Sequence, residues 1–377
     1  MIVSEVEPPQ EKKMKDSHSL SFSSLPDEIA ENCIARISKW NYPNLSLVSK
    51  RFLSLLSSPE LYTTRSHIGT TEPCLYICVQ HPKHQRPKWF TLWMKPDEIK
   101  NDYQLIPLQS SSPTVPYDST IAVGSEIYVI GGSYEAPSSS VRVLNCRSHT
   151  WRNAPNMTVA REEATAILLD QKIYVMGGCV NDKSSANNWF EVFDINTQTW
   201  SALPSPRADY DELRQYIVVN AAVKGKIYAM AQEKEYTYEP TSGAWEVVRE
   251  KSSHLDVWCA IENVMYCCTY AGHLCWYDYE AKEWREIKGL EYLRGDRTWG
   301  LGMRSGFGLV NYGGKLVVMR PRIEKESLKL KVKIWCAKIA LEKRVGGEVW
   351  GKIEWLNSVL KVPKSYEYCV SCVAVSI

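Results

Sequence analysis

Two cysteines near the end of the chain have the spacing that metal-binding and redox-active thiols often share. Cys369 and Cys372 are separated by two residues, and His81 and His84 are the only histidines that lie close together. The cysteines stand in an apolar, strand-like run, where residues three apart point to opposite faces. A zinc site needs four ligands, and no second cysteine pair of this kind accompanies the first. We therefore interpret both as structural thiols and expect neither a metal nor another cofactor.

Other kinds of catalytic chemistry are not indicated by the sequence either. The seven histidines are scattered, and we find neither a phosphate-binding glycine loop nor a nucleophile elbow. The net charge is +2, whereas a nucleic-acid-binding surface usually needs a strong basic excess. No apolar run approaches the length of a membrane span. These patterns predict a protein that is not an enzyme and that binds neither nucleic acid nor membrane.

The organisation of the chain is indicated by its length and its aromatic residues. At 377 residues it is too long for one ordinary core, and it holds 14 Trp and 21 Tyr but only 6 Phe. Large aromatics that recur at intervals are typical of repeats.

Residues 1–19 are polar and charged and lack the apolar segment of a secretion signal. We expect them to form a disordered tail, and we expect the protein in the cytoplasm, the nucleus or both.

Residues 22–68 have the pattern of three short helices. Ser24 is a suitable cap, Pro26 stands in the first turn, and two acids follow at the positive end of the helix dipole. Apolar residues then recur at helical spacing, which gives each helix an apolar face. Because so few residues bury little surface, we expect the module either to pack on the larger domain or to complete its core against a partner.

Three strings within this module resemble the F-box in residue type and spacing. They are Leu25-Pro26-Asp27-Glu28-Ile29, Ile34-Ala35-Arg36-Ile37 and Leu45-Ser46-Leu47-Val48-Ser49-Lys50-Arg51-Phe52. An F-box docks on the Skp adaptor of cullin–RING ubiquitin ligases. The resemblance implies that seven residues meet the adaptor or support the contacting surface: Leu25, Pro26, Ile29, Leu45, Val48, Lys50 and Phe52. It places the F-box at residues 20–68.

Beyond this module the chain repeats a turn followed by a β-branched or aromatic strand, as a β-hairpin requires. Five such units are aligned on residues that are 46, 54, 37 and 52 positions apart: Ile127, Ile173, Ile227, Val264 and Leu316. In the first four units a second string ends in a tryptophan: Trp151, Trp200, Trp245 and Trp284. One large aromatic residue in each repeat can fill the space between neighbouring sheets.

Two of these units carry a diglycine at the end of the second strand, Gly131-Gly132 and Gly177-Gly178. Glycine allows positive φ or close backbone approach near a crowded axis. A diglycine, an aromatic–acid strand and a tryptophan at roughly fifty residues per unit resemble the kelch repeat. The resemblance implies a β-propeller over 69–377, in which these glycines and the four tryptophans are structural. Two later units lack the diglycine and so depart from the kelch pattern.

We predict a mainly β fold, a six-bladed kelch-type β-propeller preceded by a small three-helix F-box. Five units fill about 118–360, and strand-like runs at 74–79 and 89–93 form an earlier partial unit. The run at 366–377 has the character of a first strand with no blade after it. If this strand completes the first blade, the ring closes without a free sheet edge at that point.

Arginine-containing loops between repeats are the predicted target-binding sites. Arg161 and Arg207 follow proline-containing segments that lead to the next blade, and in kelch propellers such arginines often line the central face. A salt bridge between blades is the alternative role for both. A third loop holds residue types that are favoured at binding hot spots: Arg294, Arg297, Trp299 and Arg304. Tyr210, Arg214 and Trp258 are weaker candidates.

Lysine alternates strictly with apolar residues over 328–335, which indicates a strand. A basic surface for a partner is one interpretation of this pattern. We favour the other, an outer strand whose lysines protect it from edge pairing.

An F-box followed by kelch repeats resembles the plant F-box/kelch family, whose members are substrate receptors of SCF (Skp–cullin–F-box) ubiquitin ligases. The resemblance implies that the F-box holds the Skp adaptor while the propeller holds a protein target for ubiquitination and degradation. The alternatives are a kelch interaction scaffold without a ubiquitin-ligase role and a kelch enzyme similar to galactose oxidase. The scaffold leaves the F-box unexplained, and the enzyme would need clustered histidine and tyrosine copper ligands.

Overall fold

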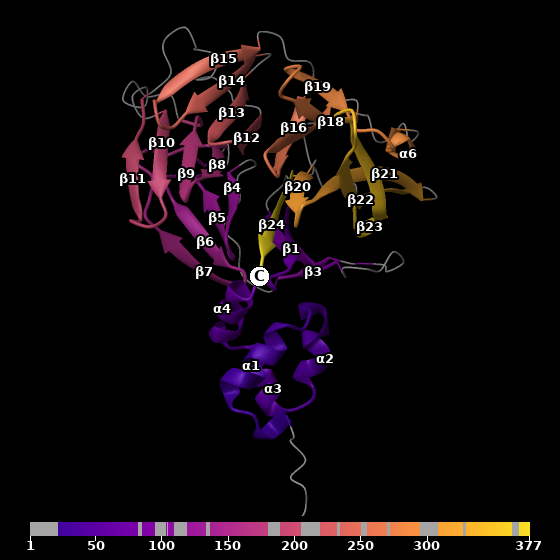
Figure 1. The fold of residues 1–377 in the computed structure, drawn as a ribbon. Helices are drawn as coiled ribbons and strands as arrows, with labels where there is room; N and C mark the ends of the chain where they lie inside the picture. Colours follow the sequence, from indigo (N-terminus) through magenta and orange to yellow (C-terminus); the bar gives the residue numbers. More distant parts are fainter. Residues whose placement is uncertain are drawn as a thin grey trace, which may run out of the picture. The chain divides into compact units, whose positions relative to one another are not determined.

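The computed structural model describes residues 22–81, 85–94, 103, 105–108, 119–132, 136–179, 189–204, 219–231, 234–249, 255–269, 272–294, 308–326, 329–363 and 369–377. The chain divides into two compact units, Met1–Thr70 and Thr71–Ile377. The first is helical and the second consists mainly of β-sheets (Figure 1). The tail predicted at 1–19 lies outside the described residues.

The helical unit contains four short α-helices where the sequence predicted three. They are α1 (Asp27–Ala35), α2 (Tyr42–Ser46), α3 (Lys50–Leu56) and α4 (Pro59–His67), with 3-10 turns η1 (Phe22–Ser24) and η2 (Lys39–Asn41). The predicted second helix is divided at Ser49, whose backbone is extended and whose hydroxyl accepts a hydrogen bond from the Phe52 amide. A serine in this role caps a new helix, so α3 begins after it. None of the described helices is long and apolar enough to cross a membrane.

A small core and one buried arginine hold these helices together. The buried apolar residues come from all four helices: Ala30, Ile34, Ala35, Tyr42, Leu55, Leu56 and Leu61. Arg65 of α4 is only 1% exposed, and its Nη1 donates to the carbonyl oxygens of Ala35 and Ile37 at 3.0 and 2.7 Å. Because a buried guanidinium must be satisfied by acceptors, these bonds tie the end of α1 to α4.

Six four-stranded antiparallel sheets form the second unit, and each is one blade of a propeller (Figure 1). Blade 1 contains β1 (Pro73–His81), β2 (Gln85–Leu92), β3 (Ile106–Pro107) and β24 (Cys369–Ser376). Blade 2 contains β4 (Thr120–Val123), β5 (Glu126–Ile130), β6 (Val141–Asn145) and β7 (Thr150–Ala154). Blade 3 contains β8 (Thr165–Leu169), β9 (Lys172–Met176), β10 (Phe190–Asp194) and β11 (Thr199–Ala202).

The remaining blades follow the same order along the chain. Blade 4 contains β12 (Val219–Val223), β13 (Lys226–Ala231), β14 (Lys234–Glu239) and β15 (Ala244–Arg249). Blade 5 contains β16 (Leu255–Ile261), β17 (Val264–Thr269), β18 (Leu274–Asp278) and β19 (Glu283–Glu286), with helix α6 (Glu291–Arg294) after it. Blade 6 contains β20 (Gly308–Tyr312), β21 (Lys315–Glu326), β22 (Lys329–Lys343) and β23 (Val349–Pro363). The predicted fold of six blades is confirmed.

The C-terminal strand closes the ring, as the sequence predicted. β24 pairs antiparallel with β1, with Cys74 opposite Val375 and Ile77 opposite Cys372. Hydrogen bonds of 3.0 Å run in both directions between the backbones of Glu72 and Ile377 and extend this pairing. The first and last segments of the propeller therefore share one sheet, and a hydrogen-bonded ladder holds the ring shut.

The Cys372 thiol has an apolar environment on β24. Its Sγ is 3.4 Å from the Sδ of Met319. Burial raises the pKa of Cys372 to about 12, so the thiol stays protonated and reacts poorly at neutral pH. Among the residues that the structure describes, no group of three or more His, Cys, Asp or Glu side chains is arranged to hold a metal ion. This placement supports the interpretation of Cys372 as a structural thiol.

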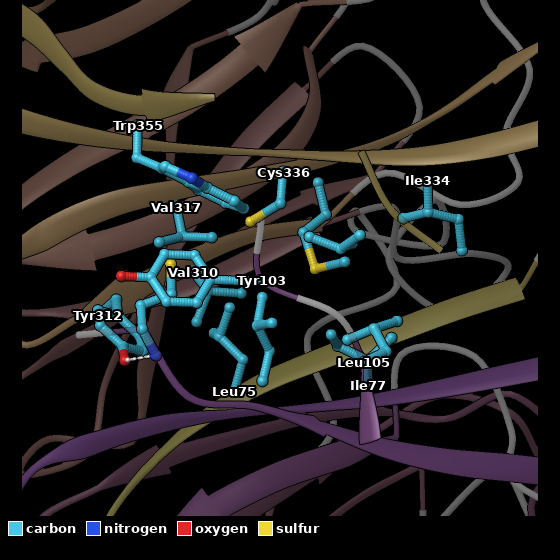
Figure 2. Close-up of a cluster of buried hydrophobic side chains, with 14 of the residues drawn as sticks. Leu75, Ile77, Tyr103, Leu105, Val310, Tyr312, Val317, Ile334, Cys336 and Trp355 are labelled. Carbon is cyan, nitrogen blue, oxygen red and sulfur yellow. Dashed lines mark hydrogen bonds between the residues drawn. The ribbon is translucent and has the colours of Figure 1, made fainter. Parts of the chain in front are cut away.

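Hydrophobic clusters between adjacent blades fix the shape of the ring. Figure 2 shows the cluster between blades 6 and 1, which includes Leu75, Ile77, Val310, Val317, Ile334 and Cys336. In the same cluster the rings of Tyr103 and Trp355 meet edge to face, with centroids 5.1 Å apart. The Met94 amide donates to the Tyr312 hydroxyl at 3.4 Å, so the polar end of this buried tyrosine is satisfied (Figure 2).

Each of the four repeated tryptophans is half-buried and reaches the preceding blade. Two contacts are between rings, with centroids 6.1 Å apart for Trp151 and Trp89 and 5.7 Å apart for Trp245 and Phe190. The other two are hydrogen bonds from the indole N–H, from Trp200 to the Pro155 carbonyl at 2.9 Å and from Trp284 to the Glu235 carboxylate at 3.1 Å. The aromatic residue of each repeat thus joins one blade to the blade before it.

Trp200→Ala is expected to lower the free energy of unfolding by about 2–3 kcal/mol. The variant loses the packing of the indole on Phe193, whose ring centroid is 5.0 Å away, and the hydrogen bond to Pro155. The loss stays below the value for a fully buried tryptophan because Trp200 is half-buried. Trp200→Phe keeps a ring against Phe193 and loses the hydrogen bond and part of the packing, so it should cost less than the alanine variant, about 1 kcal/mol. Equal losses in urea melts of the two variants would contradict a packing contribution.

Candidate partner-binding sites

The predicted adaptor-binding residues form an exposed group and a supporting group. Three are half-buried and pack against the core of the helical unit: Leu25, Leu45 and Phe52. Four are exposed: Pro26, Ile29, Val48 and Lys50. Among these, the Ile29 side chain is 51% exposed and that of Val48 is 63% exposed. The exposed residues can meet a partner directly, whereas the half-buried ones hold the backbone that presents them.

Exposed apolar side chains are concentrated in the helical unit. Of the nine large apolar residues that are exposed in the described part of the chain, five belong to this unit: Ile29, Trp40, Leu47, Val48 and Leu53. Sequence reasoning missed Leu47 and Leu53, which are 84% and 52% exposed. The signal that could have found them is an apolar residue outside the buried core: Leu47 directly follows α2, and Leu53 stands on α3 between the half-buried Phe52 and the buried Leu55. Such a concentration on a small module marks an interaction surface.

Arg51 of α3 positions the segment that carries Leu25 and Pro26. Its Nη2 lies 2.7 Å from the Asp27 carboxylate, and its Nη1 donates to the Phe22 carbonyl at 3.2 Å. Arg51 therefore fixes the start of α1 from a different helix. The sequence placed Arg51 within the F-box-like string but did not indicate this role, because its partner Asp27 is 24 residues away.

Arg161 lies inside the propeller and not on its surface. The side chains of Arg161 and Glu191 are both 0% exposed, and Nη2 of the arginine is 2.8 Å from the carboxylate. Nε also donates to this carboxylate at 3.0 Å, and Nη1 donates to the Trp189 carbonyl at 3.0 Å. The guanidinium is thus fully engaged by buried acceptors. The structure favours the alternative role, a structural ion pair, over target binding for Arg161.

The same ion pair anchors the connection between blades 2 and 3. The second carboxylate oxygen of Glu191 accepts hydrogen bonds from the amide and the hydroxyl of Thr158 at 3.0 and 2.8 Å. Nη1 of Arg161 also lies 3.2 Å from the Sγ of Cys179. Burial raises the pKa of the Cys179 thiol, and the nearby arginine charge only partly opposes this shift. Glu191 on β10 therefore holds both Thr158 and Arg161 of the connecting segment.

The other predicted target-binding residues are not brought together in the described structure. Arg294 ends α6, and Trp258 of β16 is 6% exposed with its ring 5.6 Å from that of Trp284. Trp258 is therefore a core residue. The rest lie outside the described residues: Arg207, Tyr210, Arg214, Arg297, Trp299 and Arg304. For Arg207 and for the loop of Arg294, target binding stays a prediction.

A helical module with an exposed apolar surface, followed by a β-propeller, is typical of adaptor-type proteins that join two partners. Comparison with known families gives the same division of the chain. The F-box domain model matches residues 22–64, and the model described as FKB95, Kelch-repeats domain, matches residues 89–360.

Similar proteins extend over the whole chain. An F-box/kelch-repeat protein of Arabidopsis thaliana is 56% identical over 100% of this chain and 98% of its own length. A second F-box/kelch-repeat protein of that plant is 43% identical over 98% of both chains, and a putative third is 44% identical over 97% of both. The chain therefore belongs to the F-box/kelch-repeat family.

Proposed function

We propose that this protein is the substrate-recognition subunit of an SCF ubiquitin ligase. The F-box docks on a Skp-family adaptor and through it on the cullin–RING ligase, and the propeller binds a protein target for ubiquitination and degradation. The observation that carries this proposal is the set of exposed apolar side chains on a module of the F-box family. Apolar surface is costly to leave in water, and a partner that covers it removes that cost.

The proposed chemistry takes place on the partner proteins. A target held by the propeller presents its lysines to the charged ubiquitin-conjugating enzyme at a raised effective concentration. The buried clusters between blades keep the propeller rigid, which limits the entropy lost when the target is positioned. This role requires no nucleophile from the chain itself. We propose that this activity takes place in the cytoplasm, the nucleus or both.

Replacing Ile29 and Val48 together by Asp should reduce affinity for a purified Skp-family adaptor by at least about 100-fold. Both residues are exposed, so the change places charges on the docking surface without disturbing the F-box core. The melting temperature should stay near that of the original protein, because surface substitutions usually change stability by less than about 0.5 kcal/mol. Co-purification and biolayer interferometry with the full-length chain measure the effect.

Val345→Asp provides a matched control for this experiment. Val345 is 104% exposed in the turn between β22 and β23 of the propeller, so its substitution adds a negative charge to the surface outside the F-box. This variant should bind the adaptor like the original protein. If the variant at Ile29 and Val48 also retains adaptor binding, the ligase role is contradicted and a kelch scaffold without that role gains support.

A further inference from the structure

Helix α1 begins at a residue whose side chain cannot cap it. The sequence indicated a cap at Ser24, but the structure places the N-cap at Pro26, with φ of −54° and ψ of 149°. The amides of Ile29 and Ala30 donate to the Pro26 carbonyl at 3.1 and 3.0 Å and so begin the helix. Because a proline side chain has no hydrogen-bond acceptor, the start of α1 lacks the restraint that a serine at the N-cap would supply.

Arg51 of α3 supplies a restraint from another part of the chain. Its Nη1 donates to the Phe22 carbonyl at 3.2 Å, and its Nη2 donates to the Leu25 carbonyl. Nε and Nη2 also donate to one carboxylate oxygen of Asp27, in the first turn of α1, at 3.0 and 2.7 Å. One planar guanidinium therefore holds residues on both sides of Pro26.

The two carbonyl contacts provide most of this restraint. The Asp27 side chain is 76% exposed, and water screens an ion pair at such a site, so the pair contributes little. The Arg51 side chain is only 29% exposed, and its bonds to Phe22 and Leu25 are partly buried. Carbonyl oxygens belong to the backbone, so these two bonds fix the path of the chain directly before α1.

Helix α3 holds Arg51 in position for these contacts. The hydroxyl of Ser49 accepts from the Phe52 amide and fixes the first turn of α3, which contains Arg51. The ring of Phe52 stacks on that of Phe22, with centroids 4.8 Å apart and an angle of 24° between the planes. Two successive residues of α3 thus hold Phe22, Arg51 by its carbonyl and Phe52 by its ring.

We propose that Arg51 is a positioning residue for adaptor docking. It acts through Leu25 and Pro26, and it holds them and Ile29 in the conformation that the adaptor binds. A segment that is already ordered loses less entropy when a partner binds it. If only a fraction of the molecules has this conformation, the apparent affinity falls in proportion to that fraction. The inference rests on the proposed docking of the F-box on a Skp-family adaptor.

Arg51→Met removes the restraint and is the principal test of the proposal. If the segment before α1 is then ordered in about a tenth of the molecules, affinity for a purified Skp-family adaptor falls about tenfold. Arg51→Lys should give an intermediate affinity, because an ammonium keeps the charge but cannot bond all the acceptors of the planar guanidinium. Biolayer interferometry with full-length chains measures these affinities.

Arg36→Met is the matched control for the loss of one positive charge. Arg36 is exposed and belongs to the same helical unit, where its Nε donates to the Asn32 side chain at 3.2 Å. The substitution therefore removes a charge and a surface hydrogen bond without touching the segment before α1. This variant should bind the adaptor like the original protein.

Amide hydrogen exchange separates positioning from a general loss of folding. In free Arg51→Met the amides of Ile29 and Ala30 should exchange at least about tenfold faster than in the original protein. The Leu61 amide in α4 should keep its original rate, because the core and Arg65 hold this helix. In the adaptor complex the rates at Ile29 and Ala30 should be the same in both proteins, since the bound adaptor then orders the segment.

Four results would each overturn the role of Arg51. They are an unchanged adaptor affinity in Arg51→Met, an equal loss in Arg36→Met, full affinity in Arg51→Lys, and faster exchange at Leu61 as well as in α1. Failure of the original protein to bind the adaptor would instead overturn the ligase role. Hydrogen exchange of the free proteins would still show in that case whether Arg51 orders the start of α1.

Discussion

Arg161→Ala is expected to lower the free energy of unfolding by about 3–5 kcal/mol. The variant leaves the Glu191 carboxylate, which is 0% exposed, without the guanidinium that neutralises it. It also leaves the Trp189 carbonyl without the Nη1 donor. An uncompensated buried charge costs far more than an exposed one, because the protein interior solvates it poorly. Urea unfolding of the full-length chain, followed by tryptophan fluorescence, measures the loss.

Two further substitutions test the cause of this loss. Arg161→Lys keeps the charge but cannot reproduce the contacts of Nε and Nη2 with Glu191, so it should still cost about 2 kcal/mol. Arg161→Met combined with Glu191→Leu removes both charges, and its loss should be smaller than that of Arg161→Ala. A stable Arg161→Ala variant that captures target less well would contradict the structural role and restore target binding as the function of Arg161.

Most of the propeller could be predicted because each blade repeats a local pattern. The two strands of a hairpin are neighbours in the sequence, so a turn such as Asp170 and Gln171, with φ of 48° and 58°, is visible in the residues themselves. The tryptophans at regular positions then gave the succession of blades. The string that ends in tryptophan was not recognised in the fifth unit, although Trp350 is the second residue of β23 as Trp284 is of β19, and there the prediction failed in detail. Alternating lysines predicted a strand over 328–335, and β22 confirms it from Lys329 onward. The predicted outer position is wrong, because β22 lies between β21 and β23, and no local pattern specifies which strands flank it.

The roles of the arginines could not be predicted for the same reason. Arg161 and Glu191 are 30 residues apart, and Arg51 and Asp27 are 24 apart, so each pair is formed only by the tertiary structure. Proximity to prolines in the sequence indicated a loop at Arg161, but it did not indicate that the loop turns inward. The exposed surface of the F-box was only partly predicted, since helical spacing shows which residues face the core and not which apolar residues stay outside, such as Leu47.

Gly178→Ala is expected to cost about 3 kcal/mol or more. Gly178 has a φ of +69°, where a side chain is strained, and an added Cβ would lie 2.3 Å from the Glu162 carbonyl oxygen and 3.0 Å from the Ala164 amide nitrogen. Both contacts are with backbone. The Glu162 amide also donates to the Gly178 carbonyl at 2.7 Å, so the two segments cannot move apart without losing this hydrogen bond.

Gly225→Ala separates the close contact from the backbone strain. Gly225 has a similar φ of +75°, but an added Cβ would meet no atom within 4 Å, so this variant should cost only about 1–2 kcal/mol. Urea melts of the two variants give the difference directly. Equal losses would mean that the positive φ alone explains why Gly178 must be glycine, and that the backbone at Glu162 can shift to make room for a Cβ. A larger loss at Gly178 would mean that the second glycine of this diglycine is required by the close approach of the segment between blades 2 and 3, which Arg161 and Glu191 hold in place.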